Sequence, residues 1–202
     1  MAYVMEGGQP GGINRPAPFD LSWQKLMMWI FIITDGLLFG GFLAAYGFGR
    51  LSVTAWPDQS EVFHIGYITA MTFILISSSV TMARAVEVSQ QKDKGKVLFF
   101  LLLTIFGGLI FLGMQVYEWS SIIHEGARLN FNPWGVAQFS SYFFIITGFH
   151  GTHVLTGVII LVITAIRFKM GKSSEEGVEL TGLYWHFVDL VWVFVFTLFY
   201  LI

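Results

Sequence analysis

Residues 147–157 read Thr-Gly-Phe-His-Gly-Thr-His-Val-Leu-Thr-Gly and lie near the middle of an apolar run from Ala137 to Ile166. The run is long enough to cross a bilayer, which takes roughly 20 apolar residues. Its two histidines, His150 and His153, are three residues apart and therefore share one side of a helix. Because polar groups at bilayer depth are costly unless they meet a partner, the stretch predicts a spanning helix whose polar side faces other protein.

The composition of the whole chain supports this interpretation. Of its 202 residues, 55% are hydrophobic and only 12% are charged, whereas soluble domains average about 25% charged residues. The chain is therefore predicted to be an integral membrane protein. Its net charge of -2 gives no reason to expect a nucleic-acid partner. The absence of cysteine excludes disulfides, thiolate metal sites, iron–sulfur clusters and cysteine nucleophiles.

Five segments are apolar enough and long enough to be predicted as membrane-spanning helices. They are Trp23–Phe48, Phe63–Ala83, Val97–Tyr117, Ala137–Ile166 and Thr181–Leu201. Together they predict an all-α integral membrane protein, a bundle of five transmembrane helices that forms one domain over residues 23–202. The Gly- and Pro-rich residues 1–22 are predicted to be a flexible N-terminal tail.

Basic residues are distributed unequally between the two sides of the predicted membrane. One side carries nine of them, and the other carries only Arg50 and Arg128. The nine are Arg15, Lys25, Arg84, Lys92, Lys94, Lys96, Arg167, Lys169 and Lys172. Since positive charge favours the cytoplasmic side, the N-terminus is predicted to be cytoplasmic and the C-terminus to lie outside.

Asp35 lies near the midpoint of the first predicted helix. An unpaired carboxylate at that depth costs a few kcal/mol, so we expect Asp35 to face a neighbouring helix. At about 1.5 Å per residue from the inner helix ends, Asp35 lies at about 18 Å and His153 at about 20 Å. A contact between this carboxyl and this imidazole is therefore predicted. The residues alone leave open whether Asp35 serves packing or the handling of protons or lipids.

Two further polar pairs occur at a spacing of three residues. His186 and Asp189 lie in the fifth predicted helix, at depths of about 8 Å and about 12 Å. Gln115 and Glu118 close the third predicted helix, and this position predicts that Glu118 is a solvated carboxylate at a helix end. In each pair the two side chains share a helix face.

The intramembrane histidines and carboxylates resemble a metal-ligand set only in outline. The chain has five histidines, and Asp35 and Asp189 are the only carboxylates deep in the predicted spans, so no metal site and no catalytic residue is predicted. The histidines are interpreted as interhelical hydrogen-bonding groups. Small residues are predicted to allow close approach of helices. They are Gly36, Gly40, Ala44, Gly148, Gly151 and Gly157.

Three motifs resemble subunit III of haem–copper terminal oxidases, and the resemblance covers all five predicted helices. Residues 149–154 are similar to the family's Phe-His-Gly-x-His-Val signature. Residues 185–192 are similar to its Trp-His-Phe-Val-Asp-x-Val-Trp signature, and residues 115–119 to its Gln-x-x-Glu-aromatic segment. Many members have seven helices, with Glu at the position of Asp35. The five-helix form with Asp resembles bacterial quinol-oxidase subunits, so cytochrome c and quinol both remain open as the electron donor.

The resemblance implies an accessory subunit, without redox centres, of a respiratory oxidase that reduces oxygen to water and pumps protons across the bacterial cytoplasmic membrane. It implies that this chain holds no cofactor and that the haems and copper belong to subunits I and II, its expected partners, with a larger respiratory supercomplex as a further candidate partner. It also implies phospholipid binding and support of proton uptake into subunit I. The residues that match its proton- and lipid-associated positions are Asp35, Glu118, His150, His153, His186 and Asp189.

Two other functions fit the same residues. One is a subunit-III-like protein that serves nitric oxide reductase. The other is a free-standing, proton-coupled transporter that uses Asp35 and His153. The proteins that co-purify with the chain distinguish these alternatives, since a transporter would be stable alone and without haem.

Overall fold

The computed structural model describes residues 22–91 and 93–202. The tail predicted over residues 1–22 therefore lies outside the described residues except for Ser22, as does Lys92. The elements are α1 (Trp23–Leu51), α2 (Gln59–Val62), α3 (Ile65–Gln90), α4 (Lys94–His124), α5 (Ala137–Lys169), α6 (Glu175–Val195) and a π-helical end, η2 (Phe196–Leu201). Within the described ranges, five helices are long and apolar enough to cross a membrane, which confirms the predicted all-α architecture.

The helices extend beyond the predicted apolar runs because polar residues cap them. Ser22, Asp93 and Ser174 each precede a helix, and their side chains accept a hydrogen bond from a backbone amide of the first turn. This satisfies amides that lack a partner within the helix. Gly126 and Gly171 follow the ends of α4 and α5 with φ of 101° and 68°, a conformation that glycine adopts without steric cost.

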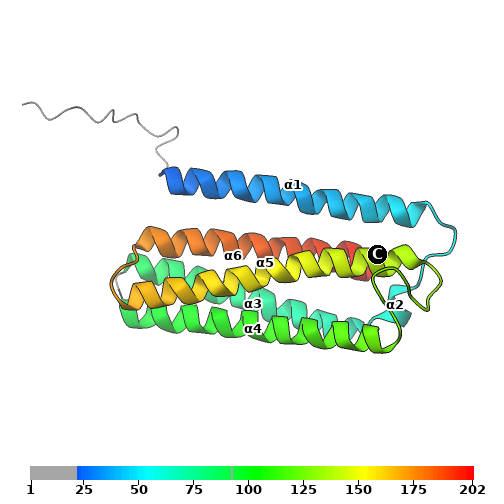
Figure 1. Ribbon diagram of the computed structural model, residues 1–202. Coiled ribbons are helices and arrows are strands. Elements are labelled where there is room, and N and C mark those ends of the chain that lie inside the picture. Colours follow the sequence, from blue (N-terminus) through cyan, green and yellow to red (C-terminus); the bar gives the residue numbers. More distant parts are fainter. Residues whose placement is uncertain (1–21, 92) are drawn as a thin grey trace, which may run out of the picture.

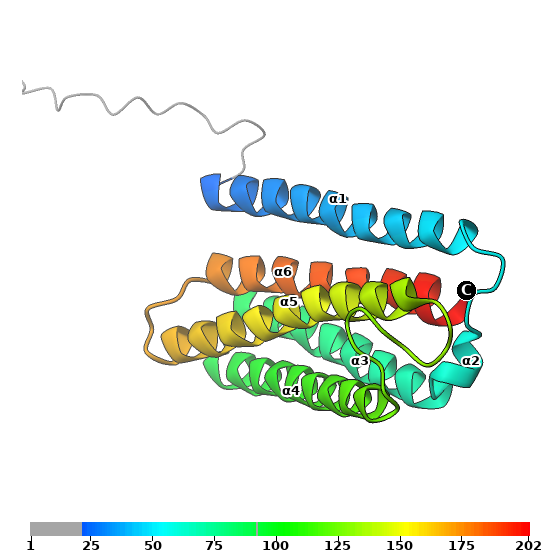
Figure 2. The same ribbon diagram turned by 45° about the vertical axis from the view of Figure 1, so that its right-hand side comes forward.

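Helices α3, α4, α5 and α6 form a four-helix group, in which α4 packs on α3 and α5, and α6 packs on α3 and α5. Helix α1 lies along the outside of this group, against α6 and α5, in both views (Figure 1 and Figure 2). Of the described residues of α1, only Asp35, Phe39 and Tyr46 are buried. The fold is therefore a packed group of four helices with a fifth attached along one side.

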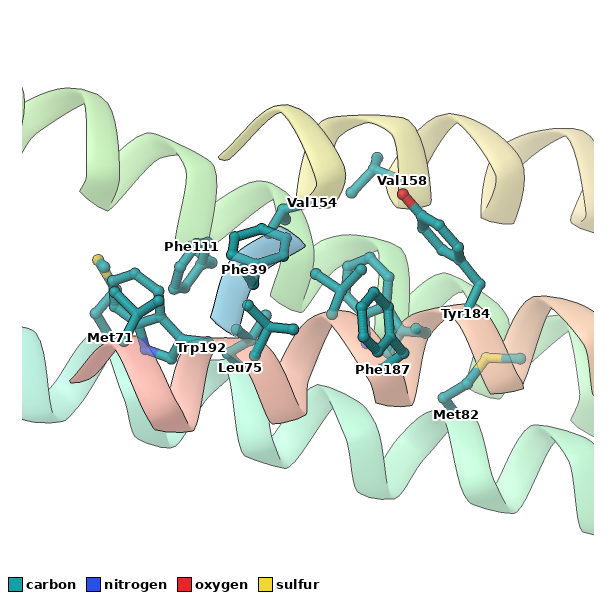
Figure 3. Packing of buried hydrophobic residues seen from close by; sticks show 14 of the residues in the cluster. Phe39, Met71, Leu75, Met82, Phe111, Val154, Val158, Tyr184, Phe187 and Trp192 are labelled. Atoms are coloured by element: carbon teal, nitrogen blue, oxygen red, sulfur yellow. The ribbon is translucent and has the colours of Figure 1, made fainter. Parts of the chain in front are cut away.

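Two tryptophans of α6 occupy the centre of the four-helix group. Trp185 and Trp192 are fully buried, and the indole N–H groups donate to hydroxyls of α3, to Ser78 Oγ at 3.1 Å and to Thr72 Oγ1 at 2.9 Å. Figure 3 shows Trp192 among other buried side chains, including Phe111 of α4. Each ring thus buries a large apolar area while its one polar atom remains paired.

Glycines make room for the Trp185 ring. A Cβ at Gly157 of α5 would lie 2.9 Å from this ring, and a Cβ at Gly108 of α4 would lie 2.6 Å from it. Similarly, a Cβ at Gly148 would lie 3.0 Å from Trp119. A side chain at Gly148 or Gly157 would therefore crowd a neighbouring indole ring.

The other small residues do not mediate close helix packing within this chain. A Cβ at Gly40 or Gly151 would meet nothing within 4 Å, and at Gly36 it would make only an ordinary contact with the Phe187 ring, at 3.7 Å. Ala44 is exposed. Within the described chain, the prediction of close approach is therefore wrong for Gly40, Ala44 and Gly151, because no neighbouring helix packs against these positions.

A short connection holds the C-terminal end of α1. Gln59 of α2 is buried, and its Nε2 donates to the hydroxyl of Tyr46 at 3.1 Å. Asp58 caps α2, since its carboxylate accepts hydrogen bonds from the hydroxyl of Ser60 at 2.7 Å and the amide of Ser60 at 2.9 Å. These bonds stabilise the charged form and lower the pKa of Asp58.

The Asp58 cap is expected to be pH-dependent. The pKa of Asp58 is lower in the folded state than in the unfolded state. The stabilisation that this cap provides is therefore present above the unfolded pKa of about 3.9 and is lost as the pH falls through the folded pKa. Backbone amide hydrogen exchange of residues 59–63, corrected for the intrinsic pH dependence of exchange, should therefore accelerate in acid. The variant Asp58→Ala should exchange fast at every pH, and equal protection in variant and wild type would contradict the assignment.

Two glycine substitutions in one helix test the packing around Trp185. Gly157→Ala should destabilise the protein by about 1–3 kcal/mol, because its Cβ overpacks the Trp185 ring. Gly151→Ala should be neutral or slightly stabilising, since alanine favours helix and nothing obstructs it. Thermal unfolding in the same detergent measures both, and equal unfolding temperatures would contradict this account of the packing.

Candidate functional site

Asp35 and His153 meet between α1 and α5. The carboxyl oxygen Oδ2 of Asp35 lies 3.3 Å from Nε2 of His153, and both side chains are largely buried. The contact predicted from helix depth is therefore confirmed. Nδ1 of His153 lies 2.9 Å from the carbonyl oxygen of Phe149. Since a carbonyl only accepts, this Nδ1 carries a proton, and Nε2 is the ring nitrogen that faces the carboxyl.

Aromatic rings enclose one side of the Asp35–His153 pair. The imidazole of His153 lies 4.7 Å from the ring of Phe149 and 5.4 Å from that of Phe39. The hydroxyl of Tyr184 donates to the backbone carbonyl of His153 at 3.1 Å, which fixes α6 against this part of α5. The pair is therefore held in a defined position by packing as well as by its own contact.

Grooves accompany α1 on both sides. The groove between α1 and α5 has a volume of about 450 Å³, and its lining includes His153, Thr152 and Thr156. The groove between α1 and α6 has a volume of about 460 Å³ and an apolar lining that includes Gly36 and Gly40. The polar side of residues 147–157 therefore meets a groove that an external molecule can enter.

His150 lies in a different environment from His153. Its side chain is fully buried, and within the described chain neither ring nitrogen has a hydrogen-bond partner. The ring instead packs against Trp192, at 4.9 Å between centroids, and against the edge of Phe111 at 5.7 Å. The prediction of an interhelical hydrogen bond is wrong for His150, because a separation of about 60° around the axis turns it into the core while His153 faces α1.

His186 does make an interhelical hydrogen bond, as predicted. Its Nδ1 lies 2.6 Å from the hydroxyl oxygen of Ser79 in α3. Asp189, one turn further along α6, is buried, and its carboxyl oxygens have no hydrogen-bond partner among the described residues. These three residues form a second polar cluster at the α3–α6 contact.

Glu118 belongs to a third cluster, and it is buried rather than solvated. Its Oε2 accepts hydrogen bonds from Nε2 of Gln115 at 3.0 Å and from the hydroxyl of Tyr200 at 3.2 Å. The prediction of a solvated carboxylate is wrong because α4 continues to His124. Glu118 therefore lies more than a turn inside the helix, where η2 covers it.

The sequence did not reveal several partners of these residues. Tyr200 and Tyr184 lie in apolar runs, and Ser79 is one of three consecutive serines whose individual partners the sequence does not indicate. Lys25 carried a usable signal, since it and Glu179 are opposite charges at the same predicted membrane side, and they form an ion pair of 2.8 Å between α1 and α6.

The three clusters are separate from one another. No group of three or more His, Cys, Asp and Glu side chains able to hold a metal occurs in the part of the chain that the structure describes. The hydrogen-bonded and ion-pair contacts above are instead suited to sharing protons and to holding helices together.

Comparison with known proteins gives a consistent result over almost the whole chain. The family model described as Cytochrome c oxidase subunit III matches residues 21–202. The chain belongs to this subunit III family. A protein of Staphylococcus saprophyticus named "Probable quinol oxidase subunit 3" is 31% identical over 187 residues, which cover 89% of each chain. A protein of Staphylococcus aureus strain USA300 with the same name is 34% identical over 187 residues, again 89% of each chain.

Membership of this family defines the general setting of the three clusters. A subunit III associates with other oxidase subunits, and the five apolar helices indicate a multi-pass membrane protein. The surfaces of α1 and its grooves are thus available to lipids and to neighbouring subunits.

Removal of a single oxygen atom tests the buried hydrogen bond between Tyr200 and Glu118. Tyr200→Phe removes a donor from a buried carboxyl and should destabilise the protein by about 1 kcal/mol or more. Tyr117→Phe is the control, because the Tyr117 ring is exposed, and its unfolding temperature should not change. Equal unfolding temperatures for Tyr200→Phe and wild type would show that the bond contributes nothing.

Proposed function

We propose that this chain is the accessory subunit III of a bacterial haem–copper respiratory oxidase, and that it flanks subunit I, binds phospholipids and supports proton uptake. The observation that carries the proposal is the contact of Asp35 with His153 beside a groove. In this proposal the haems and copper reside in subunits I and II. The N-terminus is cytoplasmic, and the complex lies in the cytoplasmic membrane.

The Asp35–His153 pair is suited to holding a proton at membrane depth. With Nδ1 of His153 committed to a backbone carbonyl, one proton shared between Nε2 and the carboxyl leaves the pair either neutral or as an ion pair. In both forms the pair of Asp35 and His153 has no net charge, so neither form leaves a lone charge in the bilayer. Such a pair can release a proton toward a neighbouring chain when another proton replaces it, since release alone would leave a lone carboxylate at this depth.

The grooves beside α1 support lipid binding. Phe187, Leu190 and Phe194 of α6 are among the apolar residues that line the α1–α6 groove. Neighbouring side chains of α1, such as Leu37 and Leu38, are exposed and apolar. Acyl chains would cover this surface, and in a bilayer they would be held by van der Waals contact with the groove and not by removal of apolar area from water. Lipid would also fill the groove between α1 and the four-helix group.

The electron donor of the proposed complex is a quinol. The support is the printed name of the two staphylococcal relatives, together with Asp at position 35 in a five-helix chain. Purification in mild detergent tests the assignment to an oxidase. Haem absorbance and quinol-dependent oxygen consumption should accompany this chain, and a stable haem-free monomer that moves a solute in liposomes would overturn it.

The variant Asp35→Asn tests proton support in the assembled oxidase. At alkaline pH, where protons are scarce, the variant should turn over severalfold more slowly or inactivate sooner than wild type. The difference should shrink in acid. Oxygen consumption against pH, at equal haem content, measures this.

Two matched variants accompany this measurement. Asp35→Glu keeps the carboxyl and should retain activity, whereas Glu61→Gln changes an exposed carboxylate outside the spanning helices and should leave the activity at alkaline pH unaltered. If Asp35→Asn matched wild type in rate and lifetime at every pH, Asp35 would be a packing residue.

A further inference from the structure

The contact between α3 and α6 leaves one polar atom open on its outer side. Nδ1 of His186 is paired with the hydroxyl of Ser79 at 2.6 Å, and both residues are partly exposed. The other ring nitrogen, Nε2, has no hydrogen-bond partner among the described residues. Unlike the enclosed ring nitrogens of His150, it is open to the surface. Whichever atom of the Ser79–His186 bond donates, Nε2 is left as an unused donor or acceptor.

This open nitrogen lies at membrane depth. At about 1.5 Å per residue, His186 is about 16 Å from the start of α6 at Glu175. The spanning segment continues to Leu201, so a hydrocarbon core of about 30 Å centred on it would place His186 roughly 10 Å inside the core. The polar atoms of phospholipids lie outside the core. An acyl chain could cover the imidazole but could not bond to it, and an unpaired polar atom in hydrocarbon is costly.

Apolar side chains flank the open nitrogen on both helices. On α6, Leu190 follows His186 by four residues, shares its side of the helix and is 55% exposed. On α3, Ile76 and Ala83 lie three residues before and four residues after Ser79, and both are exposed. These five residues form the α3–α6 face. The small side chain of Ala83 lets another helix approach closely.

A second copy of this chain would not supply the missing partner. A symmetric contact would bring the α3–α6 face against itself. The polar side chains of this face are Ser79, which is already bonded, and His186. The two Nε2 atoms would be in the same protonation state, and two donors or two acceptors form no hydrogen bond. The arrangement therefore calls for a different chain.

We propose that the α3–α6 face docks against a membrane-spanning helix of another oxidase subunit, which presents one hydroxyl or amide side chain to Nε2 of His186. Either group can both donate and accept, so it fits whichever state of the imidazole is present. The remainder of the partner helix is apolar where it packs on Ile76 and Leu190. This inference rests on the proposed function, because that function supplies the neighbouring subunit.

Photocrosslinking within the purified, haem-containing complex tests the position of this interface. The photoreactive residue p-benzoyl-phenylalanine is placed at position 190 in one sample and at position 106 in another. Phe106 is the control, because it is 62% exposed and lies on α4. Mass spectrometry should find adducts with another subunit from position 190 and lipid adducts from position 106. Lipid adducts alone at position 190, or adducts with a second copy of this chain, would overturn the proposal.

Two variants test the hydrogen bond itself. His186→Leu removes both ring nitrogens, whereas Ser79→Ala removes only the internal bond and keeps Nε2. The measured quantity is the rate at which this chain is lost from the haem-containing subunits during a detergent wash. His186→Leu should be lost roughly 3–10-fold faster than wild type, as expected for one interhelical hydrogen bond, and Ser79→Ala should match wild type. Wild-type retention of His186→Leu, or equal loss of both variants, would contradict the outward role of His186.

These outcomes are distinguishable from failure of the proposed function. A chain that does not co-purify with haem would refute that function. Lipid adducts alone at position 190, in a complex that does contain haem, would overturn only the docking face and leave the Asp35 measurements untouched.

Discussion

The burial of two indole rings of α6 organises the four-helix group. The buried indole N–H groups of Trp185 and Trp192 are paired, because the hydroxyls of Ser78 and Thr72 in α3 accept hydrogen bonds from them. The glycines of α4 and α5 let the neighbouring backbones approach the Trp185 ring. In a bilayer, where apolar burial between helices gains little over lipid contact, close packing and paired polar atoms supply the specificity.

Helix α1 is attached by a different kind of interaction. It buries few side chains and depends on contacts spread along its length: the Lys25–Glu179 ion pair, the Asp35–His153 contact and the bond of Gln59 to Tyr46. Between these contacts, grooves separate it from α5 and α6. The most polar contact inside the predicted membrane therefore lies where packing is weakest, and this combination makes the α1 side the candidate site for lipids and protons.

The sequence predicted the five helices and the Asp35–His153 contact because both follow from length, hydropathy and depth along a helix. It misplaced Glu118, His150 and Gly40, because those environments depend on rotation about the helix axis and on the distance between helices. Where a spanning helix is apolar on every side, its sequence does not reveal which side meets protein. The burial of Glu118 further depends on η2, a local departure from α-helical geometry for which the sequence gave no sign.

The attachment of α1 has a consequence for assembly. During synthesis α1 emerges before α3 and α4, yet the helices that it contacts, α5 and α6, are made after them. The first helix must therefore reside in the bilayer while α3 and α4 are added, with Asp35 deprived of His153. Membrane insertion of this chain thus includes an interval in which a solitary carboxyl is tolerated, and closure of the bundle by its C-terminal half ends that interval.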